Sequence, residues 1–499
     1  MRAMKRWGLL CVAVLFGTGR LLAAERLTAT NPPPRPNILL ILADDLGARD
    51  LAFQGSDYHL TPHLDQLSRQ GMVFTQGYAG AGNCTPSRAC LWSGQYPPRH
   101  GVYAVGSTER GPQEQMRLQP VPGKSGLAPG TRTLAQALKA ADYATALFGK
   151  WHLDGPDGAT PQQQGFDLHF DPRAGDPNAP GADPQDPKAM FALTRAAGDW
   201  IARQTNGRFF AAVSHHAIHS ALEARPETLA KFRDRRPGVH QTNALYAACL
   251  ADFDDSVGQL LARLRELGRE TNTLVIFTSD NGATPASPQE PLRGNKGAYY
   301  EGGIRVPFFA RWPAVIRPGT RSGIPVTQID LFPTLLDAAG VSVLDGLTLD
   351  GESLLPVLRS QRVLQRRAVF WHFPGYLDTP VIRGRDPVFR TRPVSVIRKG
   401  DWKLHLFHEE WLLDGGRAGL ATNNAVELYN LMTDPGERKN VAATSPKRDE
   451  LLKDLLQWLE EIRAPWPTDR SGKPISVTPK PEPAKKESLK PVRPKKSPK

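Results

Sequence analysis

Two pairs of oxygen-bearing side chains in this 499-residue chain have the chemistry to bind a hard cation. Asp44-Asp45 and Asp280-Asn281 each follow directly after a short apolar run. Carboxylate and amide oxygens suit Ca²⁺, which accepts about six to eight oxygen ligands in a flexible geometry. Asp and Asn also commonly start turns, and that role would explain either pair alone. The two pairs together, with the cysteine segment described next, favour a metal site.

The segment CTPSR at 84–88 places a cysteine where a helix is expected to begin. Pro86 indicates this start, because proline is tolerated in the first turn of a helix and not in its interior. The free N–H groups of a first turn favour an anion held over residue 84. The structural alternative makes Cys84 a small buried thiol and Arg88 a surface charge, but the flanking residues favour a functional site.

Lysine and histidine side chains follow two other apolar runs. Lys150 and His152 stand two residues apart, and in an extended segment they would point to the same side. A lysine can stabilise negative charge, and a histidine can act as a general base near neutral pH. His219 follows His215 and His216. We interpret His219 as a proton donor and the other two as structural, with His216 as the rival candidate for the donor.

Each of these polar clusters follows an apolar run that is typical of a buried strand. The runs lie at 37–43, 143–148, 209–213 and 273–277. Helical patterns lie at 133–141 and 245–267. Continuous apolar runs are typical of strands buried on both faces of a parallel sheet, and alternating strands and helices predict a doubly wound α/β domain over 35–365. Ligands bind beyond the carboxyl ends of such strands, so the clusters are expected to converge on one crevice.

The chain changes character near residue 366. Short strand-like runs occur at 368–373, 394–398 and 402–407, and a long amphipathic helical pattern follows at 448–462. This order predicts a smaller C-terminal α+β domain at 366–465, with an antiparallel sheet and a closing helix. The last segment, 466–499, is rich in lysine and proline and has few apolar side chains, so we expect a disordered tail.

The net charge of +13 is concentrated at the two ends of the chain. Residues 467–499 hold eight lysines and two arginines against three acidic side chains, and residues 1–24 hold four basic side chains. The folded body is left with a charge of +2. We therefore expect no nucleic-acid partner. The basic tail is either simply solvated or holds an anionic polymer or the cell envelope.

Residues 1–24 have the pattern of a secretory signal peptide. Basic residues precede an apolar run at 7–16, and small residues follow where cleavage is expected. The run is too short to span a membrane, and no later segment is long and apolar enough. We therefore expect an exported protein (periplasm, cell surface or secreted), with a retained N-terminal anchor as the alternative. Cys11 would leave with the signal peptide, and Cys90 and Cys249 would form one disulfide or none.

Nine segments in order along the chain resemble the type I sulfatases, a formylglycine-dependent, arylsulfatase-like family of the alkaline phosphatase superfamily. The segments lie at 36–47, 61–65, 84–88, 96–101, 149–153, 278–282, 293–307, 350–356 and 427–437. The resemblance implies an alkaline-phosphatase-like α/β fold, with a doubly wound mixed, mostly parallel sheet flanked by helices and a smaller C-terminal α+β domain. It also implies that a formylglycine-generating enzyme oxidises the cysteine of 84–88 to 3-oxoalanine (formylglycine), whose hydrate attacks sulfur and later releases the sulfate.

The same resemblance implies a role for each candidate residue. One Ca²⁺ ion would be held by four side chains and by the converted cysteine, namely Asp44, Asp45, Cys84, Asp280 and Asn281. Arg88 and Lys150 would steady the nucleophilic oxygen, and His152 would take the proton that lets the sulfate depart. His219 and Lys296 would bind the sulfate and the bridging oxygen, with His219 as the acid. From the residues alone, a lone lysine in a glycine-containing loop is usually solvated, so the role of Lys296 rests on the resemblance.

The resemblance predicts an exported sulfuric ester hydrolase that acts on a sulfated carbohydrate or another sulfate ester. Two alternatives stay open, namely a formylglycine-dependent phosphonate or phosphodiester hydrolase and a catalytically silent protein that binds sulfated glycan. The second domain contains a WHFP segment at 371–374 and four arginines that would suit a polyanionic carbohydrate or a solvated loop, namely Arg383, Arg385, Arg390 and Arg392. The chain departs from the family pattern at 91–95 and at 220–221, where relatives commonly have Thr-Pro.

Overall fold

A large mixed sheet carries the polar clusters identified from the sequence. The computed structural model of the protein describes residues 35–174, 183–343, 346–361, 364–366 and 368–475. These residues belong to a unit that begins at Arg35. The expected signal peptide at 1–24 and residues 476–499 of the expected disordered tail (466–499) lie outside the described residues. Residues 466–475 are described and ordered, because the backbone of Thr468 pairs with that of Gln119, so the prediction of disorder is wrong for this part of the tail.

The larger sheet contains eight strands. They are β1 (Asn37–Ala43), β2 (Met72–Phe74), β4 (Tyr143–Gly149), β5 (Leu168–Phe170), β6 (Arg208–Ser214), β7 (Thr273–Ser279), β8 (Phe308–Arg311) and β9 (Thr320–Ser322). Their order in the sheet is β5-β4-β6-β1-β7-β8-β2-β9. β8 is antiparallel to both of its neighbours, and the other neighbouring pairs are parallel. The prediction of a mixed, mostly parallel sheet is confirmed.

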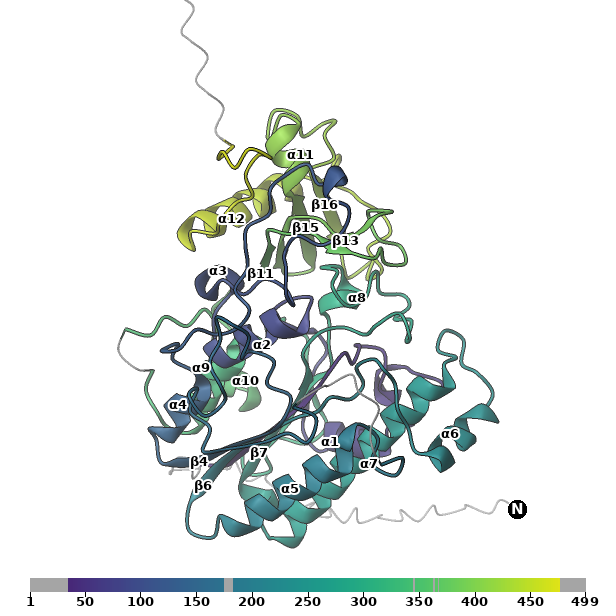
Figure 1. Ribbon diagram of the computed structural model, residues 1–499, viewed down its shortest axis with the longest axis vertical. Coiled ribbons are helices and arrows are strands. Elements are labelled where there is room, and N and C mark those ends of the chain that lie inside the picture. Colours follow the sequence, from purple (N-terminus) through teal and green to yellow (C-terminus); the bar gives the residue numbers. More distant parts are fainter. Residues whose placement is uncertain (1–34, 175–182, 344–345, 362–363, 367, 476–499) are drawn as a thin grey trace, which may run out of the picture. The chain divides into compact units, whose positions relative to one another are not determined.

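The central strands are buried on both faces, as their continuous apolar sequences predict. In β1, Ile38 and Leu40 belong to one core cluster, whereas Leu39 and Ile41 belong to another. Side chains of four helices complete the first cluster, namely α2 (Cys84–Ser93), α4 (Leu134–Lys139), α9 (Leu331–Ala338) and α10 (Leu355–Leu358). Helices on the opposite face complete the second, namely α1 (Pro62–Arg69), α5 (Met190–Arg203) and α7 (Ala244–Glu266) (Figure 1). The sheet is therefore covered by helices on both faces.

A second, antiparallel sheet begins at Ala368. Its strands pair in the order β11 (Ala368–Phe373), β14 (Val394–Lys399), β15 (Trp402–Phe407) and β16 (Val426–Asn430). Helix α12 (Lys447–Glu461) packs on this sheet, where Leu452 and Leu455 meet Leu404. Trp371 lies in a different cluster and donates its indole N–H to the carbonyl oxygen of Ala79 at 2.9 Å. The predicted smaller α+β part is therefore present and is joined to the first part by buried contacts.

Shorter elements complete the described chain. Two-stranded sheets are formed by β3 (Gly77–Tyr78) with β10 (Val326–Thr327) and by β12 (Leu377–Asp378) with β13 (Phe389–Thr391). The remaining α-helices are α3 (Pro97–His100), α6 (Pro226–Arg233), α8 (Glu301–Ile304) and α11 (His408–Leu413). The 3-10 turns are η1 (Ala52–Gln54), η2 (Gln113–Gln115), η3 (Pro187–Ala189), η4 (Glu270–Asn272) and η5 (Gln328–Asp330).

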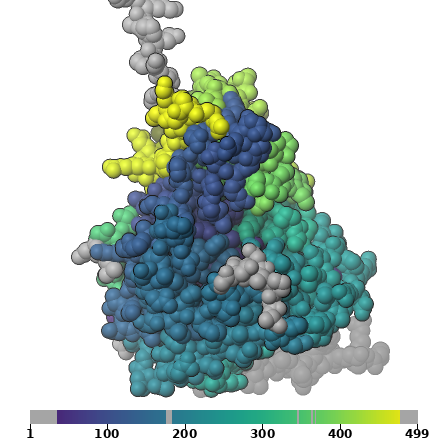
Figure 2. All heavy atoms as spheres, in the orientation of Figure 1, coloured from purple at the N-terminus to yellow at the C-terminus, as the bar shows by residue number. Residues whose placement is uncertain are grey.

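The chain that follows α3 lies against the C-terminal part. This segment is blue in Figure 2 and lies beside green and yellow residues. Isolated β-bridges join Glu109 to Tyr376 and Gln119 to Thr468. Cys90 and Cys249 are both buried free thiols, which answers the question that the sequence left open. Among the described residues, no helix combines the length and the apolar character needed to cross a bilayer.

Candidate active site

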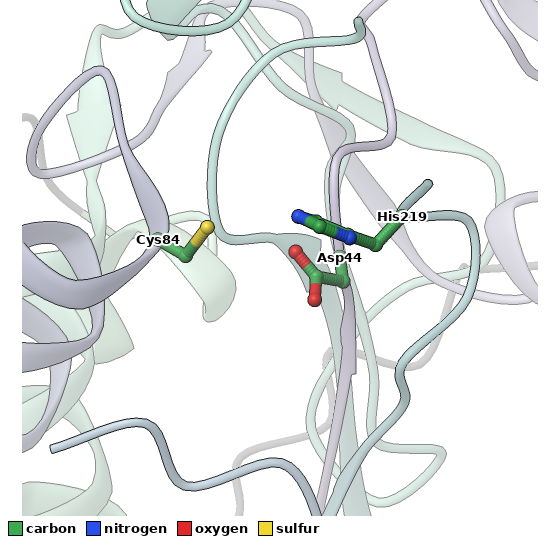
Figure 3. Close-up of side chains that lie close together, drawn as sticks. All are labelled: Asp44, Cys84 and His219. Atoms are coloured by element: carbon green, nitrogen blue, oxygen red, sulfur yellow. The ribbon is translucent and has the colours of Figure 1, made fainter. Parts of the chain in front are cut away.

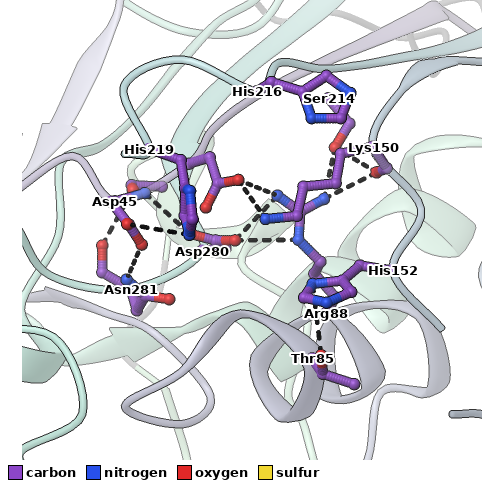
Figure 4. A network of polar contacts seen from close by, with 12 residues as sticks. Asp45, Thr85, Arg88, Lys150, His152, Ser214, His216, His219, Asp280 and Asn281 are labelled. Carbon is purple, nitrogen blue, oxygen red and sulfur yellow. Dashed lines mark hydrogen bonds and ion pairs between the residues drawn. The ribbon is translucent and has the colours of Figure 1, made fainter. Parts of the chain in front are cut away.

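The polar clusters that follow β1, β4, β6 and β7 meet at the carboxyl ends of these strands, as predicted. A cavity of about 280 Å³ opens there. Its lining residues are Asp44, Asn83, Cys84, Val105, Arg110, Lys150, His152, His216, His219, Lys296 and Arg390. Asp45, Arg88, Asp280 and Asn281 lie beneath this lining and are bonded to it or to one another (Figure 4).

Helix α2 presents Cys84 to the cavity at its first residue. Asn83 precedes the helix in an extended conformation, and all ten residues of α2 are buried. The Cys84 sulfur lies within 4.8 Å of ligand atoms of Asp44 and His219 (Figure 3). Burial raises the pKa of the Cys84 thiol to about 11, although Lys150 opposes the shift. An unmodified Cys84 would therefore be a neutral thiol near pH 7, which is a poor nucleophile.

Arg88 lies one turn further along α2 and is fully buried, so it is not a surface charge. Its Nε and Nη2 each lie 2.9 Å from one carboxylate oxygen of Asp280. Its Nη1 donates to the carbonyl oxygen of Lys150 at 2.8 Å and to the hydroxyl of Ser214 at 2.6 Å. Arg88 therefore ties α2 to the carboxyl ends of β7, β4 and β6.

Two lysines pair with the two carboxylates that follow β1. Lys150 Nζ donates to Asp44 Oδ2, and Lys296 Nζ lies 2.8 Å from Asp45 Oδ2. Burial opposes ionisation of Asp44, but Lys150 and His219 outweigh it and hold the pKa of Asp44 well below its usual range. Burial likewise opposes the charge on Lys296, and Asp45 outweighs it and raises the pKa of that amine. Asp44 and Lys296 are therefore both charged at neutral pH.

The oxygen atoms beneath the cavity fit a hard divalent cation. Ligand atoms of Asp44, Asp45 and Asp280 lie within 4.8 Å of one another. Asp44 Oδ1 and Asn281 Oδ1 are buried and have no hydrogen-bond partner in the part of the chain that the structure describes. Burial and the neighbouring Asp44 raise the pKa of Asp280 to about 7. Unpartnered buried oxygens and crowded carboxylates are the features that a bound calcium ion would relieve.

His152 lines the cavity beside Lys150, but the two residues do not lie on one side of an extended segment, as the sequence predicted. The backbone at His152 is left-handed (φ 62°), so the two side chains do not share a side through an extended segment. His152 Nδ1 lies 3.4 Å from the hydroxyl of Thr85. Burial and the positive charges of Lys150 and Arg88 lower the pKa of His152 to about 2. The ring is therefore neutral at neutral pH.

The three histidines that follow β6 occupy three different environments. His215 is fully buried and packs edge-on against Phe253, outside the cavity lining. His216 lines the cavity, and its Nε2 lies 2.9 Å from Asp171 Oδ1. His219 also lines the cavity, and its Nε2 lies 3.8 Å from Asp45 Oδ2. His216 and His219 are therefore both within the site, although the sequence favoured a structural role for His216.

Sequence reasoning missed several residues around the cavity. Asn83, Val105 and Arg110 line it, and Asp171 lies behind His216. Among the four arginines of the second part, only Arg390 is in the lining. The other three bind carboxylates or carbonyl oxygens elsewhere, and the WHFP segment lies at the end of β11 outside the lining. Arg390 was one of the four arginines that the sequence analysis considered for a polyanionic substrate, whereas Arg110 comes from a loop without periodic patterning, so no sequence signal placed it there.

Comparison with known proteins identifies two family models. The Sulfatase family model matches residues 36–341. A second model, described as N-sulphoglucosamine sulphohydrolase, C-terminal, matches residues 295–465. The chain is 32% identical to a sulfatase of Formosa agariphila, over 91% of this chain and 94% of that protein. It is 33% identical to N-acetylgalactosamine-6-sulfatase of Sus scrofa, over 91% of this chain and 89% of that protein.

Solved structures share the fold. Ps i-CgsB in complex with k-i-k-neocarrahexaose superimposes with a TM-score of 0.66 at 25% identity, covering 88% of this chain and 96% of that chain. The phosphonate monoester hydrolase of Agrobacterium radiobacter superimposes with a TM-score of 0.61 at 23% identity, covering 86% of this chain and 96% of that chain. The second likeness concerns the fold alone.

Proposed function

The chain belongs to the sulfatase family and is a sulfuric ester hydrolase, and from that premise we propose an exported enzyme that cleaves sulfated carbohydrate with a formylglycine at position 84 and one calcium ion. The placement of Cys84 carries the proposal. This side chain is the first residue of a buried helix, faces the cavity, and lies beside carboxylates that fit a cation. The sugar named by the Sus scrofa relative supports a carbohydrate substrate.

Conversion of Cys84 would supply the nucleophile that a neutral thiol cannot. Hydrated formylglycine offers one hydroxyl that attacks sulfur and a second whose loss of a proton releases the sulfate. His152 is unprotonated at neutral pH and lies close to Thr85, the residue after Cys84. The negative charge of a sulfate on residue 84 would raise the pKa of the ring, so that His152 could take that second proton. Lys150 and Arg88 stabilise negative charge at this end of α2.

The leaving group needs a proton, and His219 is placed to give it. His219 lines the cavity near Asp45 and within the group that includes the sulfur of Cys84. Lys296 lines the same cavity and would bind the sulfate. His216 is the rival donor, but its Nε2 is engaged by Asp171, so that nitrogen does not face the substrate freely.

Calcium would be held by Asp44, Asp45, Asp280 and Asn281, with the converted residue 84 as a further ligand. The ion would withdraw electron density from the sulfate and favour the ionised form of its carboxylates. We also propose the division into a signal peptide at 1–24, a catalytic domain at 35–365, a C-terminal subdomain at 366–465 and a basic tail at 466–499. The formylglycine-generating enzyme would be a transient partner during maturation.

Peptide mass spectrometry and sulfate release test the proposal together. Protein purified from its natural host should contain the aldehyde or its hydrate at position 84 and should release sulfate from sulfated saccharides, with bound calcium detected by elemental analysis. An unconverted cysteine in active protein would refute the formylglycine mechanism. A higher kcat/KM for an aryl phosphonate than for the matched aryl sulfate would favour the phosphonate hydrolase. Unconverted, inactive protein that binds sulfated glycan would favour the binding protein.

A further inference from the structure

The cavity has more positive charge on its wall than one sulfate ester needs. Four lysine or arginine side chains line it, and Asp44 is the carboxylate in the described lining. Lys150 and Lys296 are paired with carboxylates beneath the cavity, where the reacting sulfate would lie. The other two, Arg110 and Arg390, come from the loop after α3 and from β13. They form a second cationic group at the C-terminal wall.

Arg390 is held in place without a carboxylate. Its Nε donates to the carbonyl oxygen of Thr379 and its Nη1 to that of Lys296, both at 3.2 Å. Within the described residues, no acidic side chain reaches ion-pair distance of this guanidinium. Gly297 leaves room for it, because a Cβ at that left-handed glycine (φ 90°) would lie 2.3 Å from Arg390 Cδ. The backbone therefore orients a half-buried cation toward the cavity, and Asp378 and Asp45 favour its charge from beyond ion-pair distance.

Arg110 adds a second positive charge nearby. Its Nη2 donates to Asp378 Oδ1 at 2.5 Å, and its side chain is 36% exposed. Burial and the charge of Arg110 both lower the pKa of Arg390, so the neighbouring guanidinium disfavours the charge of Arg390. Like charges placed together on a cavity wall are stabilised when an anion lies between or beside them. The small sheet β12–β13 carries both Asp378 and Arg390, which fixes this arrangement.

We propose that Arg390, with Arg110 beside it, binds a second anionic group of the substrate, either a carboxylate or a second sulfate, on the saccharide whose sulfate ester is cleaved. This inference rests on the proposed carbohydrate sulfatase function and narrows its substrate to saccharides with at least two negative charges. A guanidinium suits both groups, because its fork of N–H donors matches the oxygens of either one. Arg390 is thus a specificity-determining residue and has no part in the chemical step.

Kinetics of the wild-type enzyme provide the first test. The probes are N-acetylgalactosamine 6-sulfate, its 4,6-disulfate, and a disaccharide that joins the 6-sulfate to a uronic acid, with the matching glucosamine series. We expect kcat/KM for a doubly charged probe to exceed that of the monosulfate by about tenfold or more, the value of a charge-assisted hydrogen bond. The preference should fall as salt is raised. The disulfate and uronate probes tell which anion is bound, and equal rates for all probes would overturn the inference.

Variants then assign the preference to the arginine. Arg390→Gln should lower the ratio of kcat/KM between doubly and singly charged probes toward one, mainly through KM, and Arg390→Lys should keep part of it. Arg417→Gln, an exposed position of the same subdomain outside the cavity lining, should leave the ratio unchanged. An equal loss on every probe would mean that Arg390 contacts the reacting sulfate, and an unchanged ratio would mean that it contacts no substrate anion. Either result refutes the inference.

Binding to a Cys84→Ala protein separates this inference from the proposed function. Titration calorimetry with the same probes should show the same preference, and Arg390→Gln in this background should remove it. Tighter binding of doubly charged probes by a natural protein that releases no sulfate would support the inference and refute the proposed function. Turnover of all probes without a preference for the doubly charged ones would support the proposed function and refute the inference. A Cys84→Ala protein that binds no doubly charged probe better than the monosulfate would also overturn the inference.

Discussion

Acidification is expected to unfold the protein before most of its carboxylates are protonated. Burial lowers the pKa values of histidines outside the cavity lining, to about 3 for His100 and His215 and to about 4 for His372. Burial also lowers the pKa values of His405 and His408 well below the usual range. Such a histidine takes up a proton when the chain unfolds. Its contribution to stability is therefore intact above pH 6.5 and is lost as the pH falls below that value.

The size of this stability loss follows from the number of protons that the chain takes up when it unfolds. Each of these five histidines costs about 1.4 kcal/mol per pH unit below pH 6.5. Two carboxyls act in the opposite direction, because burial raises the pKa values of Asp254 and Asp280 to about 7. These seven groups give a net uptake of about three protons, which corresponds to a loss of roughly 4 kcal/mol per pH unit. The pKa values of His59, His152 and His216 are also lowered by burial, so these histidines act in the same direction as the five. Between pH 6.5 and pH 5 the protein should lose about 6 kcal/mol, a large part of the usual 5–15 kcal/mol of a folded domain.

Urea unfolding followed by tryptophan fluorescence at pH 7.5, 6.5, 6.0, 5.5 and 5.0 measures this slope. His100→Asn is the informative variant, because the histidine Nδ1 accepts a hydrogen bond from the Val102 N–H at 3.1 Å that an asparagine oxygen can also accept. The variant should lose about 1.4 kcal/mol less per pH unit than the wild type. His240→Asn, at an exposed position, should keep the wild-type slope. Equal stability at pH 7.5 and pH 5, or equal slopes for wild type and His100→Asn, would refute the reasoning.

Three further predictions concern the site. Cys84→Ala should abolish sulfate release and leave the thermal unfolding midpoint close to that of the wild type, as measured by calorimetry; residual turnover would remove Cys84 from the mechanism. Asp280→Ala should lose bound calcium and activity together by elemental analysis and sulfate assay, and retained activity would remove Asp280 from the metal set. Arg88→Met should destabilise the fold by about 3–5 kcal/mol because it leaves a buried carboxylate unpaired. Arg88→Lys should cost less, and equal stability of Arg88→Met and wild type in urea would contradict the tie between α2 and the strands.

The sequence predicted the elements that bury continuous apolar runs. The run at 273–277 lies within β7 (Thr273–Ser279), the helical pattern at 245–267 within one residue of α7 (Ala244–Glu266), and the run at 394–398 within β14 (Val394–Lys399). These elements have strong periodicity or long apolar stretches. The sheet's antiparallel strand β8 and the short strands β2, β5 and β9 were not predicted, because strands of three or four residues carry little pattern and owe their place to their neighbours.

The residues of the site likewise fall into those that the sequence could place and those that it could not. Residues directly after strands, such as Asp44, Lys150 and Asp280, could be placed together because topology brings strand ends to one edge. Arg390 and Asp171 could not, because their positions depend on tertiary contacts. Arg390 reaches the cavity through carbonyl oxygens of Thr379 and Lys296, which are far from it in sequence or on another element.

Charge balance explains why this site would take a cation and an anion together. Three carboxylates beneath and along the cavity face three buried or half-buried cations, namely Asp44, Asp45 and Asp280 with Arg88, Lys150 and Lys296. A divalent ion alone would leave positive charge in excess, and a sulfate ester alone would leave negative charge in excess. Each ligand therefore favours the binding of the other, by an amount that is equal for both in a linked equilibrium. The raised pKa of Asp280 indicates that the carboxylates are crowded even beside Arg88, and calcium would relieve that crowding while the ester balances the ion's charge.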